Sequence, residues 1–206
     1  DAETEINAGG PNISESEINS FLEKIRNINS DGILIISGSI PQSLGSDFYK
    51  KVLETNKLDF TIDIAGRELL DYLNYKPLLV KPNIDELEDI FGTKIDENNI
   101  IIYAKKLQEL GAKNVIVSLG KDGSIFVSDE MILKAKPIDG KLVNSVGAGD
   151  SMVGGFVYGI KNGLSKKQAY RLAVASGTAT AFSEDIASKE YIYKILEKVE
   201  VNEYGN

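Results

Sequence analysis

The sequence predicts an α/β fold built on a mostly parallel sheet, and three observations support this. Short aliphatic runs of strand length recur along the 206 residues. Most of them are separated by segments of about ten or more residues whose apolar positions follow helical spacing. Near the end of the alternation, two strand-like runs are separated only by Asp129 and Glu130, which is typical of a hairpin. We therefore expect right-handed crossovers, helices on both faces of the sheet and an antiparallel hairpin at its edge.

The predicted strands are aliphatic runs bounded by turn residues. In chain order they are residues 32–37, 59–65, 78–81, 114–119, 124–128 and 131–136.

The predicted helices carry apolar residues at every third or fourth position. The first begins at Ser14, where Glu17 completes a capping box, and a second begins at Ser46. The other predicted helices are residues 85–91, 100–110, 149–161, 165–183 and 188–199. Gly111 ends the helix of residues 100–110. Because no repeat, low-complexity tract or internal linker is visible, a single α/β domain over residues 1–206 is the simplest interpretation.

The composition excludes several classes of function. The chain has no cysteine and no histidine, so it has no Ser–His or Cys nucleophile system, zinc cluster, disulfide or His-ligated metal. Its net charge is −8, which argues against a nucleic-acid partner. Its longest aliphatic runs are far shorter than the roughly 18 residues that a membrane span requires. We therefore expect a cytoplasmic protein with no nucleic-acid or membrane partner.

The strongest chemical signal is Gly147-Ala148-Gly149-Asp150, between an extended segment and a predicted helix. The two glycines permit a tight turn, so that successive amide N–H groups point out of the helix N-terminus and form an anion hole. The helix dipole would stabilise the charge on a transferring phosphoryl group. Asp150 would then orient an attacking hydroxyl beside it. The alternative is that Asp150 only caps a helix and the glycines only turn the chain.

A second cluster follows the strand of residues 78–81. Pro82 holds Lys81 in extended geometry at the end of the strand, where its ammonium could bridge nucleotide phosphates. Asn83 and Glu86 lie three residues apart at a helix start and offer oxygen atoms of the kind that Mg²⁺ takes through water. The alternative, given equal weight, is a capping box with Asn83 as the cap and Glu86 completing it.

Two further loops follow predicted strands and are rich in small residues. Ser118, Gly120 and Gly123 could let a ribose or phosphate approach the backbone, or could form a plain turn into the hairpin. Ser37 and Gly38 could leave room for a sugar, or could simply end a strand. Ligands of such sheets bind beyond the carboxyl ends of the strands, which is where all four loops are expected.

These four loops, in this order, resemble those of the PfkB sugar kinases of the ribokinase-like superfamily. Residues 144–151 are similar to that family's D-[ST]-x-G-A-G-D signature, and residues 83–86 match its N-x-x-E motif. Asn144 stands where the signature opens with aspartate, a substitution common in the phosphohexose branch. The resemblance covers essentially the whole chain and implies a ribokinase-like three-layer α/β/α sandwich.

The resemblance also implies a reaction, the ATP-dependent phosphorylation of a hexose phosphate. In that reaction Asp150 would be the base acting on the sugar hydroxyl, and residues 147–149 would be the anion hole. Asn83 and Glu86 would organise Mg²⁺, and Lys81 would contact the phosphates of ATP. The nucleotide site would be lined by Ser118, Gly120, Gly123 and Ser183, and the sugar site by Ser37 and Gly38.

The family's N-terminal third, with a sugar-binding aspartate and most of its β-lid, has no counterpart in this sequence. Residues 1–11 resemble the tail of that lid, so the chain is expected to be the C-terminal two thirds of such a kinase, with the lid largely missing. An intact parent is expected to form a homodimer through its lid, as the family often does.

Fructose 1-phosphate is the expected acceptor, and tagatose 6-phosphate is the alternative. Because the lid excludes water and the missing aspartate holds the sugar, the isolated 206 residues are expected to show weak turnover or none. A nucleotide-binding module without catalysis is therefore the second interpretation.

Overall fold

The computed structural model describes residues 10–28 and 31–204, and within them one sheet has the strand order β1-β2-β3-β4-β5-β6-β7. Its strands are β1 (Ile33–Ser37), β2 (Asp59–Asp63), β3 (Leu79–Val80), β4 (Asn114–Ser118), β5 (Ser124–Ser128), β6 (Ile132–Ala135) and β7 (Val201–Glu203). The pairs from β1 to β4 are parallel, and those from β4 to β7 are antiparallel. The predicted parallel sheet and edge hairpin are confirmed, and β7 extends the antiparallel part beyond the prediction.

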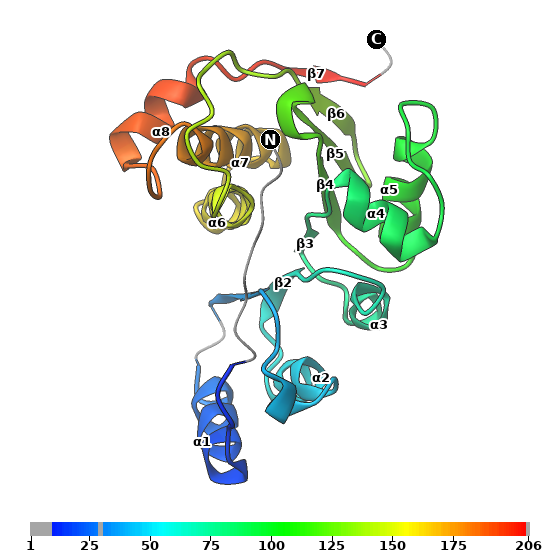
Figure 1. The fold of residues 1–206 in the computed structure, drawn as a ribbon, viewed down its shortest axis with the longest axis vertical. Coiled ribbons are helices and arrows are strands. Elements are labelled where there is room, and N and C mark those ends of the chain that lie inside the picture. The colour runs from blue at the N-terminus through cyan, green and yellow to red at the C-terminus, as the bar shows by residue number, and fades with distance from the viewer. Residues whose placement is uncertain (1–9, 29–30, 205–206) are drawn as a thin grey trace.

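Helices cover both faces of this sheet, which confirms the layered architecture (Figure 1). They are α1 (Glu15–Arg26), α2 (Phe48–Thr55), α3 (Leu69–Tyr72), α4 (Ile84–Phe91), α5 (Ile100–Glu109), α6 (Ala148–Lys161), α7 (Lys166–Ala181) and α8 (Lys189–Leu196). Figure 1 shows α3, α4 and α5 on one face, α6, α7 and α8 on the other, and α1 and α2 at the β1 end. All of these helices except the short α3 are predicted from the sequence.

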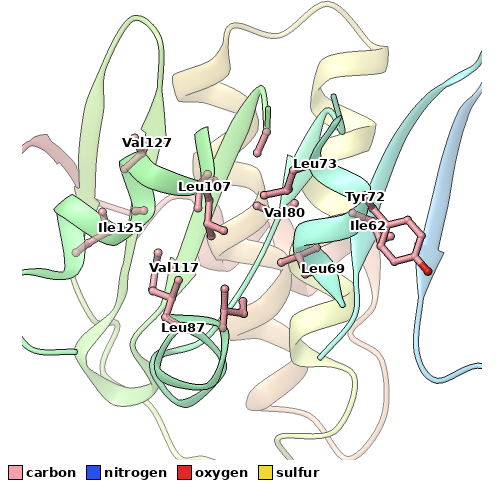
Figure 2. Close-up of a cluster of buried hydrophobic side chains, with 14 of the residues drawn as sticks. Ile62, Leu69, Tyr72, Leu73, Val80, Leu87, Leu107, Val117, Ile125 and Val127 are labelled. Carbon is pink, nitrogen blue, oxygen red and sulfur yellow. The ribbon is translucent and has the colours of Figure 1, made fainter. Parts of the chain in front are cut away.

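Each face of the sheet packs against its helices in a separate apolar cluster. Along β4, Val115 and Val117 belong to one cluster and Ile116 to the other, as the alternation of side chains in a strand requires. Figure 2 shows the first cluster, in which Leu87 of α4 and Leu107 of α5 face the strands. Burial of these side chains fixes the strands, and therefore fixes the loops at their carboxyl ends.

Helix α6 packs against α7 through residues without bulky side chains. A β-carbon on Gly155 would lie 2.5 Å from Oγ of Ser176, and one on Gly177 would overlap the side chain of Met152. The Ser151 and Thr180 hydroxyls, 2.9 Å apart, add a polar contact between the two helices. This close approach fixes the first turn of α6, where the candidate anion hole lies.

The expected lid tail and the expected absence of a membrane span can be compared with the structure only over the described residues. The interpretation of residues 1–11 as the tail of a lid falls mostly on residues 1–9, outside the described residues, and stays a prediction. Within residues 10–28 and 31–204, no helix combines the length and apolar character needed to cross a bilayer.

Candidate active site

The loops after β1, β3 and β4 lie at the carboxyl edge of the parallel strands, as predicted. Asn83, after β3, forms a parallel bridge with Ser118 at the end of β4, and the Ser118 N–H donates to the Pro82 carbonyl at 3.0 Å. The Gly38 N–H, just past β1, donates to the Asp63 carbonyl at 3.3 Å. Short backbone hydrogen bonds therefore hold the candidate loops side by side.

The Gly147–Asp150 segment has the conformation expected of an anion hole at a helix N-terminus. Gly147 is the N-cap of α6 with φ +76°, a left-handed conformation that favours glycine, and no side chain caps the helix. The Ser151 N–H donates to the Gly147 carbonyl at 2.9 Å, which closes the first helical turn. The Ala148 N–H donates to the Ser145 carbonyl at 3.2 Å. The next N–H groups of the first turn lack intrahelical acceptors, so they are available to an anion.

Asn144 holds the entry to this loop with both ends of its carboxamide. Its Oδ1 accepts from the Val146 N–H at 3.0 Å, and its Nδ2 donates to the Glu184 carbonyl at 3.2 Å. The Val143 and Asn144 N–H groups both donate to the Ala181 carbonyl, which ties the segment entering the loop to the end of α7. An ionised aspartate could only accept hydrogen bonds, so asparagine serves this position by making both contacts.

Lys81 lies directly against the anion hole, although the two motifs are far apart in the sequence. Its residue exposure is only 8%, and a β-carbon built on Gly149 would lie 2.9 Å from its Nζ. Glycine at position 149 therefore leaves the space that the ammonium group occupies. The structure thus places the ammonium of Lys81, just after β3, beside the first turn of α6.

Asp63, which ends β2, is the ion-pair partner of Lys81, and the sequence analysis did not identify it. Its Oδ2 lies 3.4 Å from Lys81 Nζ, and its side chain is 18% exposed. Burial raises the pKa of Asp63, the charges of Glu86 and Asp150 raise it further, and Lys81 opposes them. Three carboxylates thus share the electrostatic field around one lysine. The sequence feature that could have identified Asp63 is its position as an aspartate at the end of a predicted strand.

The raised pKa of Asp63 predicts a specific pH dependence of stability. Because the folded protein holds this proton at pH values where the unfolded chain has lost it, the stabilisation is complete below the ordinary pKa of aspartate. It is lost as pH rises through the raised pKa of the folded state. We expect the unfolding free energy of the unmodified chain, relative to Asp63→Asn, to fall progressively as pH rises from about 4 upward. Urea unfolding across that range measures it, and a difference that grows with pH contradicts the assignment.

Asn83 and Glu86 form the capping box that was the alternative interpretation. The Glu86 N–H donates to Asn83 Oδ1 and the Asn83 N–H donates to Glu86 Oε2, both at 2.8 Å. In the described part of the chain, no three His, Cys, Asp or Glu side chains gather as a ready-made metal site. A carboxylate has acceptor capacity beyond one hydrogen bond, so the cap leaves Glu86 an oxygen atom for a further partner. Its role with Mg²⁺ stays a prediction.

The remaining predicted residues have clear structural roles, and their roles in binding stay predictions. Gly120 (φ +57°) and Gly123 (φ +93°) turn the chain, and a β-carbon on Gly123 would overlap the Ala135 carbonyl of β6. The Ser183 hydroxyl donates to the Ala179 carbonyl at 2.8 Å, so it is bonded to its own helix. Ser37 and Gly38 are exposed at the end of β1.

The comparisons with known proteins agree with this fold. Residues 1–189 match the pfkB family of carbohydrate kinases, so the chain belongs to that family. The relatives described next are sugar-phosphate kinases. A 1-phosphofructokinase of Bacillus subtilis is 44% identical over 203 residues, which are 97% of this chain and 67% of the relative. A D-tagatose-1-phosphate kinase of Bacillus licheniformis is 38% identical, over 93% of this chain and 65% of the relative.

Solved structures show the same ribokinase-like fold. A candidate phosphofructokinase from Staphylococcus aureus superposes with a TM-score of 0.88 at 42% identity, over 98% of this chain and 67% of that protein. The phosphofructokinase-2 of Escherichia coli in complex with fructose 6-phosphate superposes with a TM-score of 0.83 at 28% identity, over 90% of this chain and 62% of that protein. The chain thus spans about two thirds of the length of these relatives.

Proposed function

We propose that this chain carries the phosphoryl-transfer site of an ATP-dependent sugar-phosphate kinase, with fructose 1-phosphate as the acceptor and fructose 1,6-bisphosphate as the product. One observation supports the proposal most strongly: the Lys81 ammonium lies 2.9 Å from the place that a β-carbon on Gly149 would take. We expect the buried ammonium, the helix N-terminus and the Asp150 carboxylate to act on one phosphoryl group. This is the charge arrangement that stabilises a transferring phosphoryl group.

Each group has a distinct role in the proposed transfer. The sugar hydroxyl attacks the γ-phosphorus of ATP in line with the leaving oxygen, and the proton of the hydroxyl passes to the Asp150 carboxylate late in the transfer. The amides of residues 147–149 donate to the phosphoryl oxygens, on which negative charge is greatest. Lys81 holds the phosphates through its ammonium, and Asp63 holds Lys81 in place at 3.4 Å. The bond from the γ-phosphorus to the bridging oxygen breaks, and ADP leaves with that oxygen and its negative charge.

The donor set around Lys81 is compatible with Mg²⁺. The charges of Glu86 and Asp150 both raise the pKa of Asp63, so three carboxylates lie within electrostatic range of one another and favour a divalent cation nearby. Mg²⁺ usually keeps several waters and binds one or two carboxylates together with substrate phosphates. We propose that Glu86 and Asn83 hold it through water, and that Mg²⁺ neutralises charge on the phosphates of ATP.

Replacing Lys81 with alanine is expected to weaken MgATP binding about tenfold or more, since one charge-assisted phosphate contact is lost. Isothermal titration calorimetry with the 206-residue chain measures this affinity. Lys113→Ala is the matched control, because Lys113 pairs with Asp59 at the amino ends of the strands. Equal affinities for Lys81→Ala and the unmodified chain would remove Lys81 from the phosphate site.

One experiment tests both the identity of the acceptor and the activity of the 206 residues without an N-terminal third. Ser37 and Gly38 are exposed, and the chain spans about two thirds of its relatives, so the sugar side is expected to be incomplete. We expect weak or no phosphorylation of fructose 1-phosphate by the 206 residues alone. A chimera that places the N-terminal third of the Bacillus subtilis relative before this chain is expected to restore turnover. Its kcat/KM for fructose 1-phosphate should exceed those for tagatose 6-phosphate and fructose 6-phosphate. Robust turnover by the 206 residues alone would contradict this.

The same exposure favours a second candidate function, a nucleotide-binding module without catalysis. The two candidates differ in one measurement, the effect of Asp150→Asn on phosphoryl transfer by the chimera. The proposed homodimer of an intact parent stays a prediction.

A further inference from the structure

A pocket of about 270 Å³ lies against the chain segment that leads into the anion hole. Its walls are residues 139–143, the end of α7 and one face of α8. Figure 1 shows the connection between β6 and α6 running past α8 and α7 before it enters α6. The residues that determine its chemistry are Lys141, Val143, Phe182, Tyr191, Lys194 and Lys198.

The charge of this pocket is opposite to that of the chain. Three lysines line it against one acidic residue, Asp139, whereas the whole chain has a net charge of −8. None of the three lysines takes part in an ion pair with the residues that the structure describes. Lys194, in α8, and Lys198, two residues past the end of α8, both line the pocket. Ammonium groups gathered in a concave surface create a local positive potential that attracts anions.

The floor of the pocket is apolar and held in place. Ile195 is 3% exposed, and the Phe182 ring packs so closely on Gly140 that a β-carbon there would overlap it. The Val143 N–H donates to the Ala181 carbonyl at 2.9 Å, which fixes the opposite wall to α7. The shape is therefore set by packing and backbone hydrogen bonds, while the lysine heads at the rim are exposed.

We propose that this pocket binds a small phosphorylated anion with two or more charged groups, at a site separate from the candidate active site. Three ammonium groups and the Tyr191 hydroxyl supply donors for phosphate oxygens, and the apolar floor accepts a short carbon skeleton. A volume of about 270 Å³ is at the lower end of ligand pockets, which suits a metabolite rather than a macromolecule. No residue that lines the pocket belongs to the anion hole or to the loops after β1, β3 and β4.

The pocket and the candidate active site share one structural connection. Residues 139–143 form a wall of the pocket and continue directly into Asn144, which holds the entry to the anion hole through Val146 and Glu184. An anion bound against this wall would therefore act on the backbone that precedes Gly147.

The test is an NMR titration of the ¹⁵N-labelled 206-residue chain with inorganic pyrophosphate in the absence of Mg²⁺. We expect saturable shifts of the amides of residues 139–143 and 191–198. Lys194→Glu combined with Lys198→Glu should weaken this binding at least about tenfold, because two charge-assisted contacts become repulsive. Lys189→Glu is the matched control, since Lys189 is an exposed lysine in the first turn of the same helix outside the pocket, and it should leave the affinity unchanged.

Three results would overturn the proposal. The shifts could be confined to residues 147–150, which would assign the anion to the candidate active site alone. The double variant could bind as tightly as the unmodified chain. Lys189→Glu could weaken binding as much as the double variant, which would indicate nonspecific attraction to α8. The pair Lys194→Gln with Lys198→Gln removes charge without reversing it, should also weaken binding, and serves if the glutamate variant unfolds.

Discussion

Replacing Asp150 with asparagine in the chimera is expected to lower phosphoryl transfer to fructose 1-phosphate by about 10²- to 10⁴-fold. The amide cannot accept the hydroxyl proton, and its oxygen carries no charge with which to orient the attacking group. MgATP affinity should be nearly unchanged, since the anion hole is made of backbone amides and Lys81. Coupled-enzyme kinetics give the first quantity, and calorimetry gives the second.

The control for Asp150→Asn is Asp89→Asn, which changes an exposed carboxylate on α4 in the same way. Turnover by the control should match that of the unmodified chimera. If Asp150→Asn also retained full turnover, the proposed base would be wrong. If no chimera transferred phosphate while MgATP still bound, the nucleotide-binding module would be the better description.

Replacing Gly149 with alanine is expected to have the second largest effect, a loss of about 10²-fold in phosphoryl transfer, the size associated with misplacing a reacting group by roughly 1 Å. The new β-carbon would lie 2.9 Å from Lys81 Nζ and 3.1 Å from Cε, so the lysine must move away from the anion hole. Fold stability should not fall, because alanine favours a helix over glycine by about 1 kcal/mol. Kinetics of the chimera and thermal unfolding of the chain measure the two effects.

Gly154→Ala provides a matched control within the same helix. A β-carbon on Gly154 would meet no neighbouring atom within 4 Å, so only helix propensity changes. The two variants should therefore gain similar stability and differ strongly in turnover and in MgATP affinity. Equal activity of the two variants would show that the position of Lys81 against Gly149 has no catalytic importance.

The helices and strands of this chain are largely predictable because local signals and tertiary packing agree. The capping box of Ser14 and Glu17, the alternation along β4 and the short link between β5 and β6 all give the observed elements. Two elements are not predictable in this way. The α3 helix has only four residues and depends on burial of Leu69 and Tyr72, whereas β7 has the polar sequence Val-Asn-Glu and exists because β6 offers it an edge.

The candidate site is predictable as a set of motifs but not as a geometry. The spacing of Gly147, Gly149 and Asp150 indicates an anion hole, and Lys81 is indicated only by its place after a strand. That the lysine occupies the space beside Gly149 depends on how α6 packs on α7 and on the sheet, which no local pattern encodes. Asp63 is missed for the same reason, since its importance comes from the buried lysine of the neighbouring strand.

Asn83 and Glu86 show why two readings of one motif need not exclude each other. The capping hydrogen bonds are present, and they also fix the carboxylate of Glu86 beside Asp63 and Lys81. A structural cap thus positions an acidic group at the carboxyl edge of the sheet. Asn144 is similar, because its hydrogen bonds to Val146 and Glu184 are structural and yet set the backbone before Gly147.

The most direct test of the central claim is a crystal structure of the chimera with Mg²⁺, a non-hydrolysable ATP analogue and fructose 1-phosphate. We predict that the terminal phosphate accepts hydrogen bonds from the amides of residues 147–149 and lies next to Lys81, with Asp150 facing the 6-hydroxyl of the sugar. A terminal phosphate held elsewhere, or an Asp150 carboxylate turned away from the sugar hydroxyl, would contradict the assignment of this site.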